Sequence, residues 1–97
     1  MATYIGLATF TEQGMRTVKD TVKRADAARE IGAKFGVQMK NIHWTLGAYD
    51  LVVECEAKDD AAMVAYSLAI ASAGNVKFQS LRALTRDEMS QVVTKLP

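Results

Sequence analysis

The sequence predicts an α+β fold in which two helices cover one face of a four-stranded antiparallel sheet. Three observations lead to this prediction. Runs rich in β-branched and aromatic residues and runs of helical periodicity follow one another in the order β-α-β-β-α-β. The turn signal Gly47-Ala48 joins the two middle strands directly, so they should form a hairpin. A capping signal near the C-terminus adds a short final helix.

The first half of the chain contains a strand, a helix and a second strand. The β-rich run Thr3–Phe10 is the first strand, and residues 11–14 interrupt it. From Met15 to Phe35 the apolar residues recur near one face of a helix, and the charged residues lie elsewhere. Gly36 is the expected helix stop. Residues 37–46 form the predicted second strand.

The second half repeats the pattern from the hairpin onward. Residues 49–57 form the third strand, and Asp59-Asp60 supplies an N-cap and a negative first turn for the second helix. This helix should end near Ala73, because Gly74-Asn75 follows. Residues 76–84 form the fourth strand.

Thr85 and Glu88 have the spacing of a capping box, which predicts a C-terminal helix to about Lys95. The complete order is the split βαβ, or ferredoxin-like, plan with one added helix. In this plan the second face of the sheet stays bare unless another molecule covers it.

Composition restricts the class of protein. A chain of 97 residues suits one domain, residues 1–97, and 49% hydrophobic residues are ample for its core. A net charge of +1 argues against a nucleic-acid partner. The single cysteine, Cys55, cannot form an internal disulfide, and no basic leader precedes the first strand. Residues 61–76, the longest uncharged run, are too few for a membrane span. We therefore expect a cytoplasmic protein without a membrane partner.

The hairpin assigns side chains to the two faces of the sheet. A two-residue turn would pair Leu46 with Tyr49 and would alternate the other side chains along both strands. The face toward the helices then holds Ile42, Trp44, Leu46, Tyr49, Leu51, Val53 and Cys55. The opposite, open face holds Met39, Asn41, His43, Thr45, Asp50, Val52 and Glu54.

The outer strands add apolar residues to both faces. We expect Ile5, Leu7, Val76 and Phe78 in the core, and Tyr4, Ala8, Phe10, Gln79, Leu81 and Ala83 on the open face. Such a face is more apolar than a solvated sheet face should be. The sequence thus predicts a homodimer that buries both open faces, sheet against sheet. The nearly uncharged helix at residues 61–73 suggests a higher oligomer, or close packing inside one subunit.

The chain resembles the GYD domain family, named for a Gly-x-Tyr-Asp turn that is here Gly47-Ala48-Tyr49-Asp50. The resemblance covers nearly the whole chain. It includes Phe10-Thr11-Glu12-Gln13-Gly14, Lys23-Arg24, Thr45-Leu46-Gly47, Asp59-Asp60, Gly74-Asn75-Val76 and Arg82-Ala83-Leu84-Thr85. It implies a small cytoplasmic bacterial or archaeal protein related to dimeric α+β barrels, in a family without a general assigned function. Val22 and Trp44 depart from the family pattern, which more often has proline and tyrosine there.

His43 is the candidate catalytic base. It is the single histidine, and the predicted pairing places it across from Val52 and diagonal to Asp50 and Glu54. An imidazole beside a carboxylate can take up protons near neutral pH. Asp50 or Asn41 would then orient a substrate. The alternative is that His43 is a half-exposed polar residue without a chemical role.

Five residues are candidates for ligand binding: Tyr49, Asn41, Phe10, Gln13 and Arg82. Tyr49 and Asp50 should point to opposite faces, so they do not form one catalytic pair. Asp50 can instead accept N–H groups of its own turn, and Tyr49 can close the end of the core. Arg82 and Arg24 can each hold an anion, although surface ion pairs are the better expectation.

We expect no metal and no cofactor, because one histidine and one cysteine give no ligand cluster. Cys55 should lie in the core, away from His43, where it is inert. Three functions stay open. The first is a homo-oligomeric module for assembly or for binding a small apolar or aromatic ligand. The second is a cofactor-independent isomerase or monooxygenase with His43 as base. The third is a protein-interaction subunit that uses the second helix, which would predict larger oligomers or a co-purifying partner.

Overall fold

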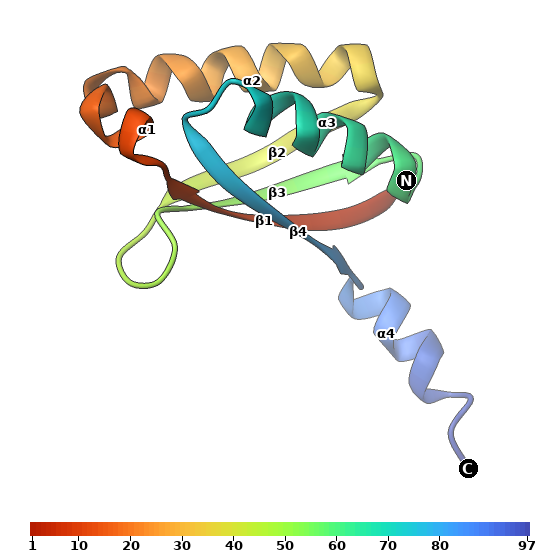
Figure 1. The fold of residues 1–97 in the computed structure, drawn as a ribbon. Coiled ribbons are helices and arrows are strands. Elements are labelled where there is room, and N and C mark those ends of the chain that lie inside the picture. Colours follow the sequence, from red (N-terminus) through yellow and green to blue (C-terminus); the bar gives the residue numbers. More distant parts are fainter.

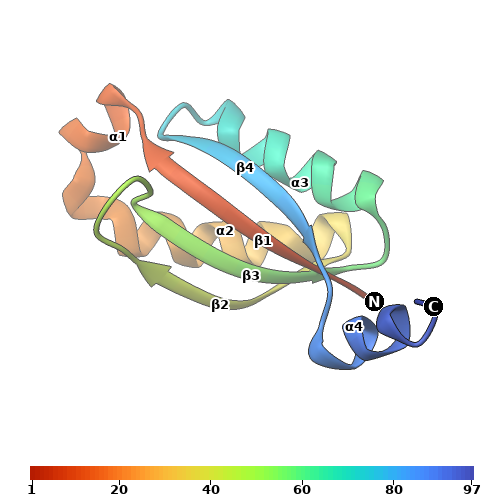
Figure 2. The same cartoon turned by 90° about the horizontal axis from the view of Figure 1, so that it is seen from below.

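The computed structural model describes residues 1–97 and contains one four-stranded antiparallel sheet in the order β2-β3-β1-β4. This is the ferredoxin-like order, and the predicted fold class is confirmed (Figures 1 and 2). The strands are β1 (Ala2–Phe10), β2 (Val37–Trp44), β3 (Leu51–Ala57) and β4 (Val76–Ala83).

Figure 1 shows the helices on one side of this sheet, apart from the C-terminal one. None of them is long and apolar enough to cross a membrane. The helical elements are α1 (Glu12–Arg16), the 3₁₀ turn η1 (Val18–Asp20), α2 (Thr21–Phe35), α3 (Asp60–Ser72) and α4 (Arg86–Val93). The other face of the sheet carries no helix, and α4 extends away from the end of β4 (Figures 1 and 2).

The segment after β1 differs from the prediction of one helix over residues 15–35. Thr11 caps a separate short helix, because its hydroxyl accepts the N–H of Gly14 at 3.1 Å. The same hydroxyl donates to the carbonyl of Gly74 at 2.6 Å, which ties α1 to the connection between α3 and β4. A Cβ at Gly14 would lie 2.0 Å from the carbonyl oxygen of Asn75, so this contact requires glycine.

The predicted helix ends are confirmed. Gly36 ends α2 in the left-handed conformation, with φ of 70°. Asp59 caps α3 by accepting the N–H of Ala62 at 2.9 Å. Thr85 and Glu88 form the expected reciprocal capping box at the start of α4.

The core lies between the sheet and helices α2 and α3. Its center is Tyr66 of α3, which is fully buried and donates from its hydroxyl to the carbonyl of Ala28 at 2.7 Å. That bond joins the two helices and satisfies the one polar atom of the buried ring. The other buried members are Tyr4, Val37, Met39, Val53, Cys55, Ala57, Ala62 and Met63.

The pairing of β2 with β3 is as predicted near the hairpin, but the turn is different. Ile42 faces Val53, and Trp44 faces Leu51. The predicted two-residue turn is wrong, because β2 ends at Trp44 and β3 begins only at Leu51. Residues 45–50 form a wider loop in which Leu46 is fully exposed. The loop is closed by hydrogen bonds from Thr45, whose N–H donates to the Asp50 carbonyl at 2.8 Å.

The face assignments of Met39, of Leu46, of Tyr49 and of the β1 side chains were wrong. Met39 lies in the core opposite Cys55, because the register of β2 shifts by one residue between Met39 and Asn41. The sides of β1 are exchanged. Tyr4, Ala8 and Phe10 face the helices, while Ile5 and Leu7 lie on the open face.

The reason for the exchange is that β1 is a central strand with apolar residues on both sides, so its sequence carries no polar alternation. The β4 assignment is confirmed. Val76 and Phe78 face the helices, and Gln79, Leu81 and Ala83 face away from them.

Candidate functional site

The open face mixes apolar and polar side chains, and the carboxylate of Glu54 lies on the central strand β3. One row across the strands contains His43, Val52, Leu7 and Gln79, and the next contains Asn41, Glu54, Ile5 and Leu81. We call Ile5, Leu7, Val52 and Leu81 the open-face patch. The first three are half-buried by their neighbours, and Leu81 is 40% exposed. No helix of the chain covers this patch (Figure 2).

His43 lies on the edge strand β2, beside Val52 as predicted, and its imidazole is exposed without a hydrogen-bond partner in the protein. The nearby polar groups bond elsewhere. The amide of Asn41 donates to Glu54 at 3.1 Å. The carboxylate of Asp50 accepts the backbone N–H of Phe10 at 2.8 Å, rather than the N–H groups of its own turn. The structure therefore forms no His–carboxylate pair.

Tyr49 lies on the open-face side, not at the end of the core as expected. Its hydroxyl is 3.5 Å from the side-chain oxygen of Gln79 on β4. Because β1 lies between β3 and β4, the Tyr49 side chain spans the central strand to reach it. The loop at residues 45–50 extends below the sheet in Figure 1 and thereby borders the open-face patch at one end.

The other predicted ligand residues lie outside the open face. Phe10 faces the helices. Gln13 donates to the carbonyl of Ala73 and to the side chain of Asn75, both at 3.1 Å. Arg82 stacks over the Tyr4 ring at 5.6 Å and pairs with Glu88 at 3.7 Å, which agrees with the expected surface ion pair.

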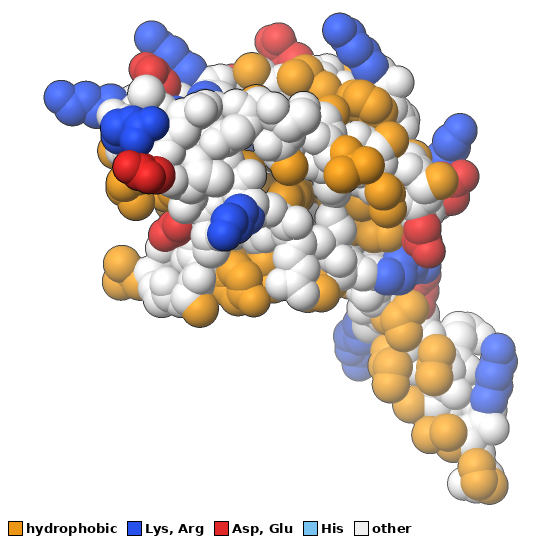
Figure 3. All heavy atoms as spheres, viewed as in Figure 1, with side chains coloured by type: hydrophobic (Ala, Val, Ile, Leu, Met, Phe, Trp, Pro, Cys, Tyr) orange, Lys and Arg blue, Asp and Glu red, His pale blue; other side chains and the backbone are white.

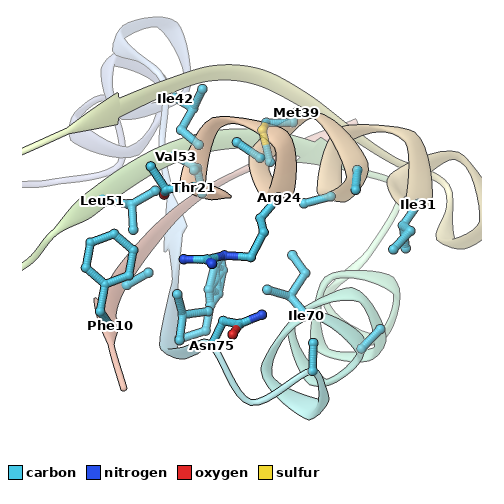
Figure 4. A pocket seen from close by; sticks show the side chains of 18 residues that line it. Phe10, Thr21, Arg24, Ile31, Met39, Ile42, Leu51, Val53, Ile70 and Asn75 are labelled. Carbon is cyan, nitrogen blue, oxygen red and sulfur yellow. The ribbon is translucent and has the colours of Figure 1, made fainter. Parts of the chain in front are cut away.

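A cavity of about 210 Å³ lies on the helix side, between α2, α3 and the sheet (Figure 4). Of its 18 lining residues, 15 are hydrophobic, and Phe10, Ile70 and Phe78 are among them. Arg24 and Asn75 are polar residues of the same lining. Sequence reasoning missed this cavity, although small residues on both helices (Ala25, Ala28 and Ala69) are the signal that could have indicated it.

Arg24 holds the segment that precedes α2. Its Nη1 donates to the carbonyl and the hydroxyl of Thr17, at 2.8 and 2.9 Å, and its Nη2 donates to the carbonyl of Gly14 at 3.2 Å. The guanidinium therefore fixes the α1–η1 connection instead of forming the surface ion pair expected for it.

Burial raises the pKa of the Cys55 thiol to about 11, so this thiol is protonated at neutral pH and is a poor nucleophile. The Tyr4 hydroxyl donates to Asp60 at 2.5 Å, and this bond raises the pKa of Tyr4. No three His, Cys, Asp or Glu side chains gather in a way that could hold a metal ion.

Comparison with known proteins identifies the family. The sequence model of the GYD domain matches residues 4–93. The chain belongs to the GYD domain family. This GYD chain is also 36% identical, over 85 residues, to the glutamine synthetase and cystathionine beta-lyase binding protein of Thermus thermophilus. The similarity covers 87% of this GYD chain and 90% of that relative, which is named for binding two enzymes.

Proposed function

We propose that this GYD chain is a cytoplasmic, homo-oligomeric binding module that assembles through its open sheet face and docks on a larger protein. The observation that carries the proposal is the open-face patch, which no helix of the same chain covers and which only the Tyr49 side chain crosses. Burying one leucine-sized side chain stabilises an interface by about 1.5–3 kcal/mol. A second copy can cover the patch with the same patch, as a two-fold interface requires.

Helix α4 supports self-association. Met89, Val92 and Val93 of α4, and Leu96 three residues after its end, follow the i, i+3, i+4, i+7 spacing, and each is exposed. We call these four residues the α4 stripe. Figure 3 shows hydrophobic side chains along one side of the C-terminal part that extends from the body of the molecule. A helix of eight residues is marginal by itself in water, so α4 needs a partner surface.

The arrangement of these parts suits a second sheet. The loop at residues 45–50 and helix α4 both extend to the open-face side, at opposite ends of the sheet (Figure 1). In the proposed dimer the open-face patch lies against its copy, and the α4 stripe packs on the partner subunit.

The docking part of the proposal comes from the relative, whose name states that it binds glutamine synthetase and cystathionine beta-lyase. The test mixes this purified GYD chain with each of these two enzymes from its own source organism and measures co-elution in size-exclusion chromatography. We expect a stable complex with at least one of them, and none with an unrelated protein of similar size. Separate elution from both enzymes would contradict docking on these two enzymes without affecting self-association.

The second candidate is the cofactor-independent enzyme with His43 as base. It is favoured by one observation: the His43 imidazole has no protein partner and faces the side that a second copy would enclose. Substituting His43→Ala should then abolish turnover and leave assembly intact. This is the weaker candidate, because no carboxylate side chain is hydrogen-bonded to the His43 imidazole.

A further inference from the structure

We propose that the cavity between α2 and α3 binds a small aromatic or branched aliphatic carboxylate. The apolar part of the ligand would enter the cavity, and its carboxylate would meet Arg24 and Asn75. This site lies on the opposite side of the sheet from the open-face patch. The inference goes beyond the proposed function and does not depend on self-association.

The size and lining of the cavity set the size of the ligand. The volume is about 210 Å³, and an apolar cavity of about 150 Å³ is already large enough to hold benzene. One ring with a short substituent therefore fits, while a drug-sized ligand does not. The lining includes Ile31 of α2, Ile70 of α3 and Phe78 of β4, and no Asp or Glu belongs to it.

The cavity exists because alanines stand where α2 and α3 pass each other. Ala25 and Ala28 line it from α2, and Ala69 lines it from α3. A leucine at such a position would occupy part of the space. The bond from Tyr66 to Ala28 fixes the helix separation, so the helices cannot simply close the gap.

Arg24 gives the site its preference for an anion. A guanidinium has five N–H donors, and the bonds of Arg24 to Thr17 and Gly14 use three of them. The Nε–H and one N–H of Nη2 make no hydrogen bond within the protein, and N–H groups of a guanidinium are strong donors to a carboxylate. In Figure 4 the Arg24 side chain extends into the cavity between Phe10 and Asn75.

Asn75 adds a further donor at the same place. Its side-chain oxygen accepts from Gln13 at 3.1 Å, while its NH₂ group makes no hydrogen bond within the protein. Two unpaired donor groups beside an apolar cavity, without an acidic neighbour in the lining, favour a carboxylate over an amine or a neutral amide.

The test measures binding by isothermal titration calorimetry with two probes of the same shape, 4-isopropylbenzoate and neutral 4-isopropylbenzamide. We expect the benzoate to bind and the benzamide to bind at least about tenfold more weakly. Equal affinities would overturn the role of Arg24 and Asn75. No binding of the benzoate at millimolar concentration would overturn the site itself.

Variants on one helix locate the binding. Ala69→Leu fills the cavity and should weaken benzoate binding at least about tenfold, whereas Ala65→Leu, one turn earlier on the exposed side of α3, should leave it unchanged. Equal binding by both variants would overturn the location. Thermal melting of each variant verifies that it is folded.

Asn75→Asp tests the charge at the mouth without removing the acceptor that Gln13 uses. It should weaken benzoate binding and leave any benzamide binding unchanged. A benzoate affinity equal to that of the unchanged chain would contradict recognition of the carboxylate at this mouth. Asn75 is substituted instead of Arg24, because loss of the Arg24 guanidinium would also remove the bonds to Thr17 and Gly14 that hold the α1–η1 connection.

Discussion

At the residue scale, Asp50 joins the end of β3 to β1. Its carboxylate accepts the N–H of Phe10 at 2.8 Å, and its own N–H donates to the carbonyl of Ala8 at 2.8 Å. The aspartate of the Gly-x-Tyr-Asp turn therefore has a structural role in this chain, because it satisfies a backbone donor where the ladder between β1 and β3 ends.

We expect Asp50→Ala to lower the free energy of unfolding by about 1–2 kcal/mol, since a hydrogen bond to a charged group is lost at a half-buried site. Asp50→Asn retains a side-chain oxygen and should lose less. Urea unfolding of both variants measures the difference. An equal loss for Asn and Ala would show that the acceptor oxygen does not matter.

Cys55 makes stability depend on pH. Burial raises the pKa of its thiol to about 11, whereas an unfolded cysteine titrates near about 8.5. Above about pH 8.5 the unfolded chain loses this proton first, so it binds fewer protons than the folded chain and the free energy of unfolding falls as the pH rises. Below that pH the thiol is protonated in both states and contributes no slope.

We expect this thiol to account for a fall of about 2 kcal/mol between about pH 8.5 and pH 10. The measurement is urea unfolding across that range for the unchanged chain and for Cys55→Ala. The variant starts from a lower stability but should show a shallower decline. Parallel curves would contradict the raised pKa.

At the element scale, α4 is the helix whose apolar side chains pack against no other part of the same chain. Its capping box fixes where it starts, and its four-residue stripe has no partner in the chain. Glu88 belongs to that cap. The backbone N–H of Thr85 is the main cause that lowers the pKa of Glu88, so the cap remains charged above mildly acidic pH.

Val92→Asp places a charge in the middle of the α4 stripe. If the stripe packs on a second copy, the substitution should weaken self-association by about tenfold or more, with little effect on the unfolding of the isolated chain. Ser90→Asp, on the same helix but outside the stripe, is the control. Sedimentation velocity compares them, and the same dissociation constant for both would refute a role of α4 in assembly.

Local signals explain which elements could be predicted from the sequence. Gly36, Asp59 and the pair Thr85–Glu88 specify helix ends through interactions within a few residues, and each was found where expected. The turn at Gly47 was misjudged because its geometry depends on Thr45 and Asp50 closing a wider loop.

Long-range packing explains what could not be predicted. The two sides of β1 were exchanged in the prediction because the strand is apolar on both faces. The contact between Gly6 and Phe78 was also not expected. A Cβ at Gly6 would lie 2.4 Å from Cζ of Phe78, so the absent side chain leaves room for the ring. For the candidate site, the position of His43 beside Val52 was predictable from the pairing. The bonds of Asp50 to Phe10 and of Arg24 to Thr17 join distant or irregular segments, which periodicity does not reveal.

At the scale of the whole molecule, helices shield one face of the sheet and a second copy is proposed to shield the other. The chain is elongated, with extents of 52 × 31 × 17 Å, because α4 extends beyond the body. A second copy that receives α4 and covers the open-face patch would give both apolar surfaces a partner.

The most direct test is the mass in solution by sedimentation equilibrium at micromolar concentration. We expect a dimer or a larger multiple of the 10.6 kDa chain. Leu81→Glu, in the open-face patch, should shift the mass to that of one folded chain, while Lys23→Glu on α2 should not. A mass of 10.6 kDa for the unchanged chain would contradict self-association through the open face.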